Sequence, residues 1–145
     1  MQTLMTLSGQ ATARQAPPPE IVVVFTTIAE TVSALRAAST LARGSEASIR
    51  LLVPQVVPYP LPVNEPAVRP SHVAGGLLAL AEEAGVEARI EIRLCRARGD
   101  ALRQSLQPGS IVVLGSRCRW WQSGPGQLGR MLRNEGHHVV LCSLK

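Results

Sequence analysis

The chain has 145 residues, a formal charge of +5, and a composition of 46% apolar, 17% charged and 3% aromatic residues. The length indicates one domain, and a charged fraction below the roughly 25% of average globular proteins excludes a charged disordered tail or a coiled coil. No apolar run approaches the ~20 residues of a membrane-spanning helix, so we predict no membrane span.

Residues 1–19 show no sustained period and end in three prolines, so they are interpreted as a flexible extension before a domain over residues 20–145. The run Ile21–Phe25 is continuously apolar and β-branched, which predicts a strand covered on both faces. Thr26 or Thr27 can cap a following helix, whose apolar residues recur at helical spacing up to Gly44.

A second strand is predicted from Ser48, but Pro54 is awkward in it because proline cannot donate to a sheet ladder. A bulge at Pro54, or pairing confined to one side there, would resolve the conflict. Residues 54–70 contain six prolines and are expected to form a long loop, which in a compact domain is either functional or poorly ordered.

Ser71 is the expected N-cap of a second helix that ends at Gly85. Apolar and polar residues then alternate over 86–94, which predicts a half-exposed strand at or near a sheet edge. Asp100 is the expected cap of a short third helix.

The last part of the chain predicts a fully apolar strand over 111–114, a loop over 115–126, a short helix around 128–132 and a final strand over 138–142. Strands and helices therefore alternate along the whole domain. This alternation predicts an α/β fold with a five-stranded parallel sheet and helices on both faces. A ligand crevice is expected where the strand order reverses, outside the carboxyl ends of the strands.

Short motifs follow one another in the last third of the chain: Arg98-Gly99-Asp100, Ser110–Arg117, Leu128–Leu132 and His138–Leu141. This series resembles the universal stress protein family. There, Gly-Asp follows the third strand, the fourth strand ends in Gly-Ser-Arg, and the last helix leads into an apolar strand. The resemblance covers residues 20–145 in element order and is specific in residue detail over 98–142.

The resemblance implies a sheet of the adenine nucleotide alpha hydrolase type, with strand order 3-2-1-4-5 and a crevice between strands 1 and 4. Nucleotide-binding members have Gly-x2-Gly-x9-Gly-[Ser/Thr] after strand 4, because glycines let backbone N–H groups approach phosphate oxygens. Here Gly115 matches the first glycine, Cys118 replaces the second, and Gly129 comes one residue late, before Arg130. The acidic residue that ends strand 1 in binding members is also absent.

We therefore expect a divergent member in which ATP binding is lost. The alternative is retained binding of ATP or AMP with magnesium, in which Ser123, Gly124 and Gly126 could help to rebuild the phosphate site. The candidate ligand-binding residues are Thr26, Thr27, Val53, Gly115, Ser116, Arg117, Arg119, Gly129 and Arg130. No catalytic set or metal site is visible, and we expect no enzymatic activity.

Trp120 and Trp121 place half of the chain's four aromatic residues side by side in one loop. Either one of them packs down while the other stays partly exposed, or the pair binds a partner or stacks on a ligand. The first functional hypothesis is thus a non-catalytic stress-response or regulatory module that acts through protein contacts. The second is an adenine-nucleotide sensor or slow ATPase with a rearranged phosphate loop.

A third hypothesis, a basic nucleic-acid binder, is disfavoured because the arginines are spread along the chain rather than gathered in an arm. Three cysteines at long spacings fit a reduced compartment, and the N-terminus has no pattern of a secretory signal, so we expect a cytoplasmic protein. The last strand, His138–Cys142, is apolar enough to need covering. Because family members often dimerise through it, we expect a homodimer.

Overall fold

The computed structural model describes residues 19–66, 68–116 and 124–143. Apart from Pro19, the predicted N-terminal extension lies outside them. The helices and strands of the described residues are β1 (Glu20–Val24), α1 (Ile28–Ala42), β2 (Ser48–Val56), α2 (Pro70–Ala84), β3 (Arg89–Cys95), α3 (Arg98–Ser105), β4 (Ile111–Ser116), α4 (Gly124–Asn134) and β5 (His138–Ser143).

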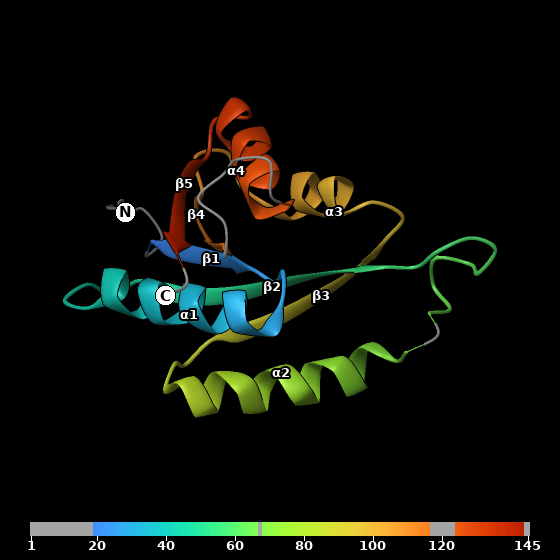
Figure 1. The fold of residues 1–145 in the computed structure, drawn as a ribbon, viewed down its shortest axis with the longest axis horizontal. Helices are drawn as coiled ribbons and strands as arrows, with labels where there is room; N and C mark the ends of the chain where they lie inside the picture. The colour runs from blue at the N-terminus through green and yellow to red at the C-terminus, as the bar shows by residue number, and fades with distance from the viewer. Residues whose placement is uncertain (1–18, 67, 117–123, 144–145) are drawn as a thin grey trace, which may run out of the picture.

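The five strands form one parallel sheet in the order β3-β2-β1-β4-β5 (Figure 1). This confirms the predicted fold class and strand order. It also confirms the edge position of β3, whose alternating pattern indicated partial exposure. Among the described residues, no helix is long and apolar enough to cross a bilayer.

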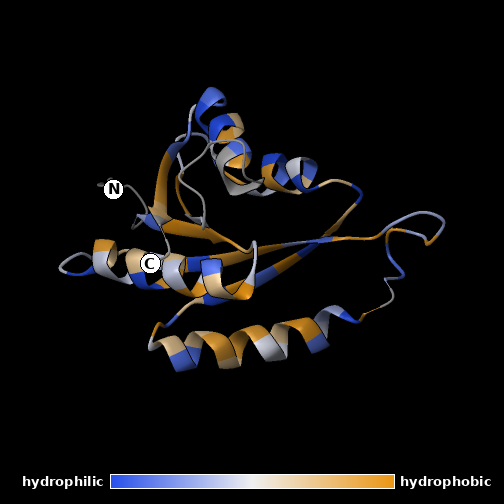
Figure 2. Cartoon of the chain, viewed as in Figure 1, coloured by the Kyte–Doolittle hydropathy of each residue, from blue (hydrophilic) through white to orange (hydrophobic). Residues whose placement is uncertain are grey.

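The core has two halves because the sheet is covered on both faces. Helices α1 and α2 lie on one side, and α3 and α4 lie on the other (Figure 1). Ile21 and Val23 of β1 belong to the core cluster under α1 and α2, while Val22 and Val24 belong to the cluster under α3 and α4. Each position of β1 after Glu20 is therefore buried, which explains its unbroken apolar sequence, drawn in orange in Figure 2.

Strand β2 continues through Pro54 to Val56, so the loop begins later than residue 54, where it was predicted. Strand β1 pairs with β2 only as far as Leu52, whereas β3 pairs with it to Val56. The Leu52 carbonyl accepts a hydrogen bond from the Phe25 N–H at 2.9 Å, so Leu52 and, two residues on, Pro54 face the β1 side. Since β1 has ended there, the missing N–H of Pro54 breaks no ladder bond. Pairing confined to one side is confirmed.

Three helix starts differ from the sequence prediction. Helix α2 begins at Pro70, one residue before the expected cap Ser71, because proline suits a first turn whose N–H groups have no helical partner. Helix α3 begins at Arg98, so Asp100 lies within its first turn and makes no cap. Helix α4 begins at Gly124, inside the predicted loop 115–126.

Gly75 and Gly76 lie in the middle of α2, and a Cβ added to either would meet no atom within 4 Å. Glycine in a helix interior costs about 1 kcal/mol relative to alanine. We therefore expect Gly75→Ala and Gly76→Ala each to raise the free energy of unfolding by roughly that amount. Urea unfolding of each variant beside the natural chain measures this, and unchanged or lower stability would contradict it.

Candidate functional site

The strand order reverses between β1 and β4, so the candidate site lies at the carboxyl ends of these two strands. Val23 pairs with Val113, and β1 and β4 then end at Val24 and Ser116. The segment after β1 leads directly into α1. The structure thus brings four of the predicted residues, Thr26, Thr27, Gly115 and Ser116, to neighbouring strand ends.

Thr27 is the N-cap of α1, and its hydroxyl oxygen accepts a hydrogen bond from the Glu30 N–H at 3.2 Å. The Thr26 N–H donates to the hydroxyl oxygen of Thr31, also at 3.2 Å. These two hydrogen bonds, each from a backbone N–H to a side-chain oxygen, fix the start of α1. The helix follows the end of β1 and packs over the sheet. Of the two predicted caps, Thr27 is the one used.

Gly115 permits the closest contact in this region. A Cβ built on Gly115 would lie 1.9 Å from the carbonyl oxygen and 2.6 Å from the carbonyl carbon of Glu30. The first turn of α1 therefore packs directly onto the backbone of β4. The residue that matches the first glycine of the phosphate-binding motif is required by helix packing, whether or not a phosphate binds.

Polar groups are buried around this contact. Glu30 and Ser116 are 6% and 4% exposed. The hydroxyl oxygen of Thr26 is buried without a hydrogen-bond partner among the described residues. Buried hydroxyls are normally satisfied, so the enclosed Thr26 hydroxyl has unused capacity to bind a water or, where its surroundings open, a ligand.

Glu30 is the site residue that the sequence analysis missed. Its signal was the pattern Thr27-x-x-Glu30, which is typical of a capping box at a helix start. The pattern places an acidic residue in the first turn of α1, close to the end of β1. Nucleotide-binding members have an acidic residue at that strand end, where this chain has Thr26 and Thr27.

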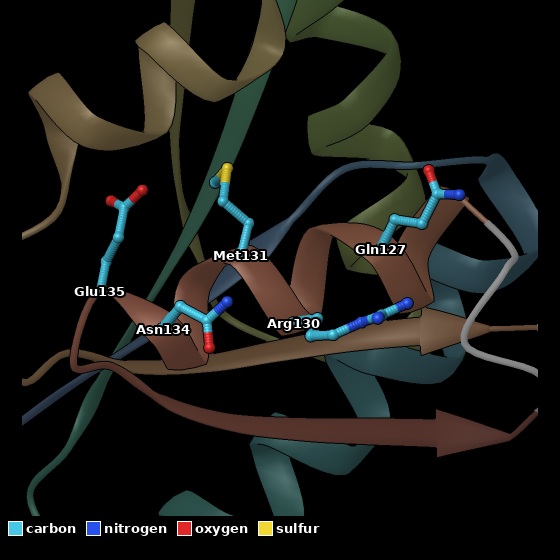
Figure 3. A pocket seen from close by; sticks show the side chains of 5 residues that line it. All are labelled: Gln127, Arg130, Met131, Asn134 and Glu135. Atoms are coloured by element: carbon cyan, nitrogen blue, oxygen red, sulfur yellow. The ribbon is translucent and has the colours of Figure 1, made fainter.

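The other described candidates lie elsewhere. Val53 is 4% exposed within the core under α1 and α2. Gly129 lets α4 approach the sheet, since its built Cβ would lie 3.4 Å from Val139 and 3.5 Å from Leu114. Arg130 lines a surface cavity of about 560 Å³ along α4, which Figure 3 shows, with Gln127, Met131, Asn134 and Glu135.

The remaining candidates, Arg117, Arg119, Trp120 and Trp121, lie outside the described residues, as does Cys118. Of the other two cysteines, Cys95 is buried and Cys142 is half-buried, and both are free thiols. Burial raises the pKa of both thiols, and for Cys95 the nearby Asp100 carboxylate raises it further. Neither thiol is therefore an activated nucleophile at neutral pH.

A buried arginine organises much of the charge on the α3 side of the sheet. The Arg50 guanidinium, on a side chain that is 7% exposed, donates to the Glu20 and Glu91 carboxylates and to the Ser105 carbonyl oxygen. Arg89 pairs with the same Glu20 carboxylate at 3.0 Å, and Arg93 with that of Glu91 at 3.0 Å.

This network sets the acidity of Glu91. Burial alone would raise the pKa of Glu91, but hydrogen bonds and positive charge from Arg50 and Arg93 outweigh it and hold the pKa below its usual 4.5. Arg103 likewise pairs with Asp100 and Glu135. These arginines are engaged with carboxylates of the same chain.

Within the described ranges, no group of three or more His, Cys, Asp or Glu side chains is arranged to hold a metal ion. Comparisons with protein-family models, with curated proteins and with solved structures find no match to this chain.

Proposed function

We propose that the protein is a non-catalytic regulatory module that acts through protein contacts, as a divergent relative of the universal stress proteins in which ATP binding is lost. Two departures from the pattern of nucleotide-binding members support the loss. Cys118 stands where the second motif glycine is expected, and Gly129 comes one residue late and is followed by Arg130. The acidic residue of nucleotide-binding members has no counterpart at the end of β1.

The exposed edge strand β5 is the observation that supports protein contacts most strongly. Among the described strands it pairs with β4 alone, and Val140 and Leu141 are 36% and 41% exposed. Val140 also lines an apolar groove of about 390 Å³ together with Leu41 and Ile111. An open, apolar edge strand is a template for pairing with another chain, so we propose a homodimer formed through His138–Cys142.

Replacing Val140 with glutamate tests this contact, because a buried charge at the interface would oppose association. Sedimentation velocity should show a dimer for the natural chain and a monomer for Val140→Glu. Leu78→Glu is the matched control, since Leu78 is 51% exposed on α2, and it should remain dimeric. Leu141→Glu probes the other face of β5. Dimers of both β5 variants would reject this interface.

A second candidate function, adenine-nucleotide sensing, is favoured by the Thr26 hydroxyl, which lacks a hydrogen-bond partner among the described residues and lies where the strand order reverses. A ribose hydroxyl or phosphate oxygen could supply its missing partner. Calorimetric titration with ATP and AMP in the presence of magnesium decides between a module that has lost ATP binding and a nucleotide sensor. Micromolar affinity that Thr26→Val weakens would support the sensor and overturn the loss of binding, whereas no binding at millimolar nucleotide would reject the sensor.

A further inference from the structure

The segment that joins β2 to α2, residues 57–69, projects beyond the rest of the sheet (Figure 1). A hydrogen bond holds each end of this segment. The Val57 N–H donates to the Cys95 carbonyl at 2.8 Å, and the Gln55 side-chain amide donates to the Val68 carbonyl at 2.8 Å. We call residues 57–69 the projecting loop. Residue 67 is not among the residues that the structure describes.

The projecting loop is also bonded within itself. The Leu61 N–H donates to the Pro58 carbonyl at 3.0 Å, and the Glu65 N–H donates to the Pro62 carbonyl at 2.9 Å, which closes two successive turns. The prolines restrict the backbone further. A loop ordered in this way loses little conformational freedom when it docks.

The loop presents apolar side chains to solvent. Tyr59 is 80% exposed, and Val63 and Val68 are 37% and 48% exposed; Val56, at the end of β2, is 46% exposed. These exposed apolar side chains are not scattered over the surface, because they lie on the projecting loop or directly before it. An exposed apolar cluster of this kind marks a contact with a partner or a membrane.

Positive charge lies at the base of the same loop. The Arg96 guanidinium stacks 4.1 Å from the centre of the Tyr59 ring and donates to the Val57 carbonyl at 2.8 Å. Arg69 ends the loop, and Arg98 follows two residues after Arg96. The loop itself contributes one carboxylate, Glu65. Exposed apolar side chains and arginines thus lie together on this loop and at its base, with the Tyr59 ring against the Arg96 guanidinium.

We propose that the projecting loop docks on the surface of an anionic lipid bilayer. A tyrosine ring suits the bilayer–water interface, short aliphatic side chains enter its apolar boundary, and arginines beside them attract anionic headgroups. Three arginines against one carboxylate of the loop favour an anionic partner, and a segment that projects beyond the sheet can reach a flat bilayer surface. This site lies on the β2–β3 side of the sheet and is separate from the β5 contact proposed above.

Co-sedimentation of the full chain with vesicles tests the proposal. The protein should bind vesicles of phosphatidylcholine mixed with phosphatidylglycerol, and bind phosphatidylcholine vesicles far more weakly. Arg96→Gln and Arg69→Gln should each weaken binding about fivefold, since one arginine near an anionic surface is worth about that factor. Tyr59→Ser should weaken it by at least a similar factor.

Matched controls separate the loop from general charge and apolarity. Arg36→Gln, at an exposed arginine of α1, and Leu78→Ser, at an exposed leucine of α2, should bind as the natural chain does. Arg69→Gln leaves the Arg96–Tyr59 stack intact, so it tests charge even if Arg96→Gln disturbs the loop. Absence of binding to anionic vesicles, or equal losses in loop and control variants, would overturn the proposal and leave the loop as a protein contact.

Discussion

Replacing Gly115 with alanine is expected to lower the free energy of unfolding by about 3 kcal/mol, at the upper end of what overpacking typically costs. The added Cβ would lie 1.9 Å from the Glu30 carbonyl oxygen. Because the obstacle is the backbone of α1 rather than the end of a flexible side chain, the whole first turn of the helix must move away from β4. Urea unfolding followed by circular dichroism measures the change.

Gly129→Ala is the matched control for this prediction. The nearest atoms to a Cβ at Gly129 are side-chain carbons at 3.4–3.6 Å, and alanine favours the helix in which it lies. We expect its stability to stay within about 1 kcal/mol of the natural chain. Equal stability of both variants would contradict the close packing of α1 on β4.

Replacing Arg50 with methionine is the second change with a large expected effect, about 2–3 kcal/mol of lost stability. The substitution keeps much of the apolar volume but leaves the Glu20 and Glu91 carboxylates and the Ser105 carbonyl without their shared donor. The cost is below that of a fully buried pair because the two carboxylates remain 32% and 28% exposed. Arg36→Met, at an exposed site on α1, should change stability by less than about 0.5 kcal/mol.

The same network predicts a pH dependence. The pKa of Glu91 is lowered in the folded chain, so its contribution to stability is complete above its unfolded value of 4.5 and is lost as the pH falls through the folded pKa. Urea midpoints measured from neutral pH downwards should therefore fall below pH 4.5. Arg50→Met should show a smaller fall, because the charge that lowers the pKa is gone. An equal fall in both proteins would contradict the role of Arg50.

The fold was predictable because its main signals are local. Continuous apolar runs such as Ile21–Phe25 are required where a parallel strand is covered on both faces, and the alternation before Cys95 indicated an edge strand. Helix starts were less predictable. Ser71 is a good cap by residue type, but Pro70 already has the backbone angle of a first helical residue and begins the helix.

The site was harder to predict because its contacts join residues that are distant in the sequence. Gly115 looked like a phosphate-binding glycine, and only the position of α1 reveals that the Glu30 backbone occupies the space of its missing side chain. Arg50 was one of many arginines spread along the chain. Its burial depends on Glu20 and Glu91 from the two neighbouring strands, whose register no local pattern specifies.

The molar mass of the unmodified chain in solution tests the central proposal most directly. Light scattering across a range of micromolar concentrations, without nucleotide, should approach twice the 15.5 kDa of one chain, because the proposed dimer pairs the edge strand β5 with its copy. A mass that stays at 15.5 kDa at every concentration would contradict a module that self-associates through this strand.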